Sequence, residues 1–203
     1  MLTQGQAQRI EQAVQAAEAA TSTEIAVCVR RASGDDRFLA AIFGAVVFLA
    51  VETLGPAIWW NYDRLVWLGV ALVAGVLAFW LCDRFDLGLR CLPPRMLVKD
   101  AHRTARAVFL DHGIDATPER NAVLLFVSQA ERYVEILPDR AAAAAIEPTH
   151  WTAIVGAFRQ AARKGDLGEA VAGAVSAIGK VCAVHFPPSA GNPDRVSNRP
   201  IQG

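Results

Sequence analysis

Two long apolar blocks, close together in the sequence, constrain the fold of this chain more than any other feature. They run from Phe38 to Trp60 and from Leu65 to Cys82. A helix of roughly 20 apolar residues crosses the hydrocarbon core of a bilayer, which is about 30 Å thick. The second block, LVWLGVALVAGVLAFWLC, carries no charge. A hairpin buried in a globular core is the alternative, but a core helix rarely stays apolar all round. The sequence therefore predicts a transmembrane helical hairpin over 38–82, with helices at about 38–60 and 65–82.

Glu52 is an acidic residue inside the first block. If the helix begins near Phe38, Glu52 lies about 21 Å along it, which is roughly 9 Å short of the far edge of the hydrocarbon core. Gly55 and Pro56 follow within one turn, where a bend admits water near the carboxylate. We therefore expect the kinked far end of a membrane helix. The alternative is that Glu52 is a proton or ion site.

Positive charges flank the predicted hairpin on the side of its two outer ends. Arginine and lysine residues near those ends are Arg30, Arg31, Arg37, Arg84, Arg90, Arg95 and Lys99, whereas the connecting loop holds Arg64. Because positive charges favour the cytoplasmic side, both termini are predicted to be cytoplasmic, in a two-pass protein of the inner or plasma membrane. Residues 1 to 20 are polar and alanine-rich, so no signal peptide is expected there.

The charge balance and the cysteine spacing exclude several other classes. Lys and Arg number 20, as do Asp and Glu, so the chain lacks the basic field that draws proteins to nucleic acid. The cysteines lie far apart without a CxxC pair, which argues against a disulfide framework or a zinc site. We expect reduced, packed thiols at Cys28, Cys82, Cys91 and Cys182.

Hydrophobic periodicity outside the hairpin predicts both strands and helices. The predicted strands are 24–30, 121–127 and 133–137. The predicted helices are 4–20, which begins at a capping box of Thr3 and Gln6, a helix that follows Pro93 and Pro94 and closes at Gly113, and two helices around 151–158 and 167–182. Residues 186–203 are rich in Pro, Gly and Asn and are predicted to form an extended tail.

The order of these elements predicts the sheet. The first strand is apolar on both faces, which is typical of an interior strand. A crossover containing a helix makes the first two strands parallel, whereas the short polar loop 128–132 makes the last two antiparallel. The fold class is thus α/β, a three-layer-type sandwich with a small mixed sheet, interrupted by the hairpin. Residues 1–37 and 83–185 are predicted to form a single cytoplasmic domain.

Four segments of this domain resemble the TPM domain family: TSTEIAVCVRR, ARAVFLDHGIDATPERNAVLLFVSQAERYVEILPDR, HWTAIVGAF and KGDLGEAV. That family includes thylakoid proteins that help maintain photosystem II and bacterial membrane-anchored relatives. The resemblance implies an α/β sandwich, often attached to a membrane, and some members have been assigned calcium binding or weak acid phosphatase activity. This chain departs from the family where LPDRAAAAAIE replaces a glycine-rich turn after the third strand.

The carboxyl ends of the parallel strands are the expected ligand site, because crevices in α/β sheets open there. Ser33, Asp35 and Asp36 follow the first strand, with Ser128 or Glu131 opposite. We expect this crevice to face the lipid headgroups. The carboxylates of Asp35 and Asp36 are hard ligands suited to calcium or magnesium. Alternatively, these aspartates only cap the incoming membrane helix.

Other polar residues have simpler interpretations. Asp111, His112 and Asp115 surround Gly113 as at a helix C-terminus, and Asp166 is placed to cap the last long helix. His102, His150 and His185 are scattered without ligand spacing.

Two hypotheses about function follow from this pattern. The chain has no GxSxG, P-loop, dinucleotide or HExxH motif, and no catalytic residue is assigned. The favoured hypothesis is a membrane-anchored interaction module that engages another membrane protein or complex for assembly or maintenance. The alternative is a divalent-metal-dependent phosphohydrolase at the Asp35 and Asp36 loop, with calcium as the candidate cofactor.

Overall fold

A computed structural model describes residues 2–34, 36–58, 63–85, 87, 92–188 and 198–202. The chain divides into two units, one made of Met1–Ser33 with Ala101–Gly203 and the other of Gly34–Asp100. The first unit is a mixed α/β structure that contains a four-stranded sheet. The second consists of an apolar helical hairpin and the segment that follows it.

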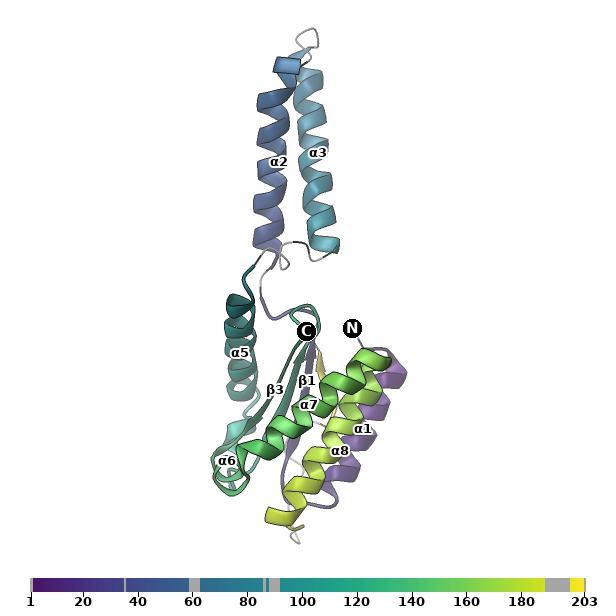
Figure 1. Cartoon of the computed structure of the whole chain (residues 1–203), viewed down its shortest axis with the longest axis vertical. Helices are drawn as coiled ribbons and strands as arrows, with labels where there is room; N and C mark the ends of the chain where they lie inside the picture. Colours follow the sequence, from purple (N-terminus) through teal and green to yellow (C-terminus); the bar gives the residue numbers. More distant parts are fainter. Residues whose placement is uncertain are drawn as a thin grey trace. The chain divides into compact units, whose positions relative to one another are not determined.

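The sheet has the strand order β3-β2-β1-β4 (Figure 1). Its strands are β1 (Ile25–Arg30), β2 (Val123–Ser128), β3 (Tyr133–Pro138) and β4 (Ile201–Gln202). β1 runs parallel to β2, in a register from Ile25 opposite Val123 to Arg30 opposite Ser128. β2 runs antiparallel to β3. The predicted mixed sheet, its strand directions and the interior position of β1 are therefore confirmed.

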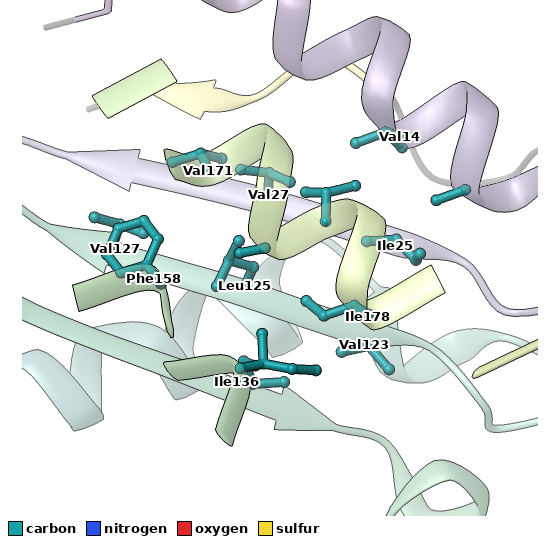
Figure 2. Close-up of a cluster of buried hydrophobic side chains, with 14 of the residues drawn as sticks. Val14, Ile25, Val27, Val123, Leu125, Val127, Ile136, Phe158, Val171 and Ile178 are labelled. Atoms are coloured by element: carbon teal, nitrogen blue, oxygen red, sulfur yellow. The ribbon is translucent and has the colours of Figure 1, made fainter. Parts of the chain in front are cut away.

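One face of the sheet is covered by α1 (Gln4–Glu18), α7 (Pro148–Lys164) and α8 (Leu167–His185). Alternate strand residues such as Ile25, Val27 and Leu125 point into this layer, where they meet Val171 and Ile178 of α8 (Figure 2). Side chains alternate across a strand, so the intervening residues must be covered from the opposite side.

The opposite face packs against α5 (Pro94–Asp111) and the short helix η1 (Ile114–Ala116). Ala26 and Cys28 of β1 lie in the same cluster as Ala101 and Ala105 of α5. These small side chains let the helix approach the sheet closely, while the larger Phe126 is completely buried. Burial of such an aromatic side chain stabilises a fold by about 1.5–3 kcal/mol.

Local signals in the sequence set the helix ends. The Thr3 side chain and the Gln6 side chain form the predicted capping box at the start of α1, and Asp166 caps α8 through the Gly168 N–H. α5 ends at Asp111, and Gly113 follows with a left-handed φ of 63°. That conformation is favourable for glycine because it has no Cβ.

Two elements were not expected from the sequence. LPDRAAAAAIE contains α6 (Arg140–Ala145), because Asp139 accepts a hydrogen bond from the Arg140 N–H and the alanine run favours helix. In the predicted extended tail, Ile201–Gln202 instead forms β4, which pairs in parallel with Cys28 and Val29 of β1. The tail thereby occupies backbone groups that β1 would otherwise present at an edge.

The hairpin of the second unit consists of α2 (Asp36–Ile58) and α3 (Arg64–Arg84). The two helices meet at small residues: a Cβ added at Gly44 would lie 2.9 Å from the Gly75 carbonyl oxygen. α2 stays helical through Pro56 to Ile58, and the indole N–H of Trp67 donates to the Val51 carbonyl at 3.1 Å. One carboxylate oxygen of Glu52 is buried without a hydrogen-bond partner among the described residues. The predicted aromatic end at 59–62 lies outside those residues.

Large apolar side chains of the hairpin are exposed in this structure, in contrast to those of the sheet. Examples are Leu72, which is 59% exposed, and Val73, which is 58% exposed. Within the described residues, three helical segments are long and apolar enough to cross a membrane: Phe38–Gly55, Arg64–Arg84 and Leu167–His185.

Candidate functional site

Three of the five predicted site residues come together at the carboxyl ends of β1 and β2. The Ser33 N–H donates to Oε1 of Glu131 at 2.7 Å, and the Ser128 hydroxyl donates to the other oxygen, Oε2. From α5, the Thr104 hydroxyl donates to the Ser33 carbonyl at 3.0 Å. The Glu131 carboxylate therefore joins the loop after β1 to the turn after β2.

Backbone hydrogen bonds extend this connection beyond the strands. The Gln129 N–H donates to the Arg30 carbonyl at 3.0 Å, and the Ala130 N–H donates to the Arg31 carbonyl at 2.8 Å. Both oxygens of Glu131 and the buried Ser128 hydroxyl are thus committed to holding two loops together. The Ser33 hydroxyl is buried with no hydrogen-bond partner among the described residues.

The side chains of the two candidate metal ligands are not described by the structure. Asp35 lies outside the described residues, and of Asp36 only the backbone is described, as the first residue of α2. This helix start is where the capping alternative would place an aspartate. Among the described residues, no group of three or more His, Cys, Asp or Glu could hold a metal ion. Calcium binding at Asp35 and Asp36 stays a prediction.

A second polar cluster, on the α5 face of the sheet, was not predicted from the sequence. His102 Nδ1 lies 2.9 and 3.0 Å from the two oxygens of Glu135, and the Tyr133 hydroxyl donates to Oε2 of Glu135 at 2.8 Å. Burial, and then the hydrogen bond and charge of Glu135, raise the pKa of Tyr133. Tyr133 therefore stays protonated at neutral pH and donates its hydrogen bond to Glu135. One sequence feature could have indicated this cluster: Tyr133 and Glu135 are two residues apart and so share one face of the strand.

The described cysteines are packed thiols, as predicted. Cys28, Cys82 and Cys182 are free and buried, whereas Cys91 lies outside the described residues. Burial raises the pKa of Cys28 to about 11, although Arg30 opposes the shift, and it raises the pKa of Cys182 to about 11. Since the thiolate is the nucleophile, neither of these two thiols is activated at neutral pH.

A comparison with family models identifies the fold around these clusters. The model described as TPM domain matches residues 95–181, which run from α5 into α8. This segment therefore matches the TPM domain. The predicted resemblance is thereby confirmed, and Ser128 and Glu131 lie within the matched TPM segment. Ser33 and β1 precede the matched segment in the sequence and lie outside it.

A solved structure supports the same fold. The chain is similar to the NMR structure of BA42 protein from the psychrophilic bacterium Bizionia argentinensis, with a TM-score of 0.63 and 17% identity. The match covers 100% of this chain and 96% of that one. At this identity the likeness shows a shared fold alone. The search of curated proteins found no match.

Proposed function

We propose that this chain is a membrane-anchored TPM domain that acts as an interaction module in the assembly or maintenance of membrane proteins. In this proposal α2 and α3 cross the inner or plasma membrane, and both termini are cytoplasmic. The observation that carries the proposal is the outward-facing apolar surface of α2 and α3. In water that surface would be unfavourable by about 25 cal/mol per Å², whereas lipid covers it at no such cost.

The pattern of charges supports the two-pass arrangement. Arg30 and Arg31 precede α2, and Arg84 ends α3, whereas Arg64 lies at the connection. The third apolar helix, α8, contributes eight buried residues to its own unit and is assigned to the domain core.

The polar contacts at the strand ends favour an interaction module over an enzyme. Glu131 and Ser128 hold loops together, and the two thiols with a raised pKa are protonated at neutral pH. A general acid donates a proton to the substrate and a general base accepts one, so either group must be free to exchange a proton. The alternative phosphohydrolase depends on Asp35 and Asp36, and no contact among the described residues favours it over the capping role.

Reporter fusions test the anchor. Alkaline phosphatase, which is active only after export, is fused at Asn61 and at the C-terminus in separate chains, with a cytoplasm-active fluorescent reporter as the complement. We expect phosphatase activity at Asn61 and fluorescence at the C-terminus. Phosphatase activity at the C-terminus would overturn the topology.

Cross-linking in intact membranes tests the interaction role. We expect the full chain to form a discrete cross-linked adduct with another membrane protein. The control chain carries the same hairpin fused to an unrelated soluble domain and should not form that adduct. An adduct of equal yield from the control would assign the contact to the hairpin and contradict the role of the TPM domain.

A further inference from the structure

A cavity of about 720 Å³ lies beside the turn between β2 and β3, under the second half of α7 and the start of α8. Among the described residues, three arginines line it: Arg132 from the turn, and Arg159 and Arg163 from α7. The described lining residues include no aspartate or glutamate. In a chain with formal net charge zero, this cavity therefore concentrates positive charge.

The local structure explains how the arginines converge. Arg159 and Arg163 are four residues apart on α7, so they share one face of the helix. Arg132 has a φ of 52°, in the left-handed region that non-glycine residues rarely adopt. Such conformations are retained where the surrounding structure enforces them, and they are enriched at binding sites.

Among the residues that the structure describes, the three arginines lack the kind of ion pair that Arg9 and Arg120 form. Arg9 pairs with Asp166 at 3.0 Å, and Arg120 lies 3.4 Å from Asp139. Across the described part of the chain, no carboxylate lies within ion-pair distance of Arg132, Arg159 or Arg163. Their guanidinium groups can each bind a carboxylate through two parallel hydrogen bonds.

The rest of the cavity selects among anionic ligands. Val134 and Phe158, which are both almost fully buried, line it together with Leu167. Pockets of several hundred Å³ hold ligands much larger than a single phosphate or carboxylate group. β3 is also an edge strand of the described sheet, and its residues Tyr133 and Val134 line the cavity. An extended segment can add to such an edge through its main chain.

We propose that this cavity binds an acidic peptide segment of a partner protein. Carboxylates of the segment pair with Arg132, Arg159 and Arg163, and an apolar side chain of the segment packs on Val134 and Phe158. This inference deepens the interaction role proposed above and rests on it, because it supplies the chemistry by which the TPM domain recognises a protein.

Fluorescence anisotropy with the full chain in zwitterionic lipid nanodiscs tests the proposal. The probe is a short labelled peptide of mixed glutamate and leucine, and its counterpart has glutamine in place of glutamate. We expect the acidic peptide to bind, with affinity that falls as salt is raised, and the glutamine peptide to bind at least about tenfold more weakly. Equal binding of both peptides would overturn the proposal.

Variants locate the binding. Arg159→Gln with Arg163→Gln should weaken binding of the acidic peptide about tenfold or more. The matched control, Arg103→Gln with Arg106→Gln, removes the same charge from exposed positions on α5 and should leave affinity within about twofold. If both pairs weaken binding equally, the effect is one of net charge and the proposed cavity is wrong. Arg159→Lys with Arg163→Lys keeps the charge but loses the planar fork, so an intermediate loss is expected.

Lipid is the competing occupant. Anionic lipid in the same nanodisc should leave the peptide affinity of the wild-type chain within about twofold; full displacement of the peptide would reassign the cavity to lipid headgroups and overturn the proposal. The peptide measurement does not depend on the orientation of the hairpin. If the peptide does not bind but the reporters show the expected topology, the proposed peptide site is wrong and the proposed membrane anchor stands. An inverted topology would instead refute the proposed anchor.

Discussion

α8 and the pair α2 and α3 are alike in composition but differ in what covers them. All three contain segments long and apolar enough to cross a membrane. In α8, 44% of that segment is buried inside the structure, compared with 17% in each hairpin helix. Val171, Val175 and Ile178 of α8 are completely buried against their own unit. Length and composition therefore identify candidates, and the packing partner distinguishes them.

The distribution of small and large residues also distinguishes the hairpin helices from α8. The hairpin turns its small residues inward, where Gly44 and Gly75 bring the backbones together, and its large residues outward. α8 turns large residues inward and also has a close approach, since a Cβ at Gly179 would lie 2.6 Å from the Ala17 Cβ of α1. Close helix packing through small residues is common in membranes, where burial of large side chains between helices is not the main driving force.

The largest expected effect comes from removing the hairpin. Replacing residues 38–82 with a short flexible linker should move the chain completely from the membrane fraction to the soluble fraction. The remaining domain should still unfold cooperatively, because the cost of closing a loop changes slowly with its length. Membrane fractionation and a denaturant titration measure the two results. A soluble, monodisperse product without a cooperative transition would contradict the single-domain prediction.

A charge placed in α8 tests whether this helix belongs to the core of its own unit. In the linker-replaced chain, Val175→Asp should destabilise the fold by about 4 kcal/mol, because an unpaired charge would be buried. Val184→Asp is the matched control in the same helix, where the side chain is 79% exposed, and should change stability by about 0.5 kcal/mol or less. Denaturant titrations of both variants measure this contrast. If Val184→Asp were as damaging as Val175→Asp, the assignment of the buried face would be wrong.

Much of this architecture follows from local sequence signals. β2 and β3 are predictable because two apolar runs flank a short polar loop, and β1 because it is apolar on both faces. The meeting of Ser33 with Glu131 follows from parallel strands ending at one edge. β4 could not be predicted, since two residues in a polar tail carry no periodic pattern and pair only through the finished sheet. Likewise, His102 and Glu135 lie 33 residues apart and meet only once α5 covers β3.

Substitution of two hairpin glycines by alanine should change stability in opposite directions. Gly44→Ala would place a Cβ 2.9 Å from the backbone oxygen of Gly75, so the helices must separate. We expect a loss of about 1–3 kcal/mol. Gly69→Ala, on the same hairpin, meets no atom within 4 Å and should stabilise its helix by about 0.5–1 kcal/mol. Titration of the detergent-solubilised chain with a denaturing detergent measures both, and effects of equal sign would contradict the proposed contact.

The smallest expected effect concerns the polar contact that ties the start of α8 to α1. A hydrogen bond from Gln6, and then one from the Gly168 N–H together with the charge of Arg9, lower the pKa of Asp166 in the folded chain. The unfolded carboxyl titrates near about 3.9, so a lower folded value adds stability that is fully present above that pH.

This stability is lost as the pH falls from about 3.9 through the folded pKa of Asp166. Asp166→Ala should therefore lower the melting temperature slightly at neutral pH, and the difference from the wild-type chain should shrink below about pH 4. Glu119→Ala, at an exposed position, is the control and should show no such convergence. Thermal scans across this pH range measure the difference. If the melting temperature of Asp166→Ala stays below that of the wild-type chain by the same amount at acidic pH, the shape of the side chain and not its charge holds α1 to α8.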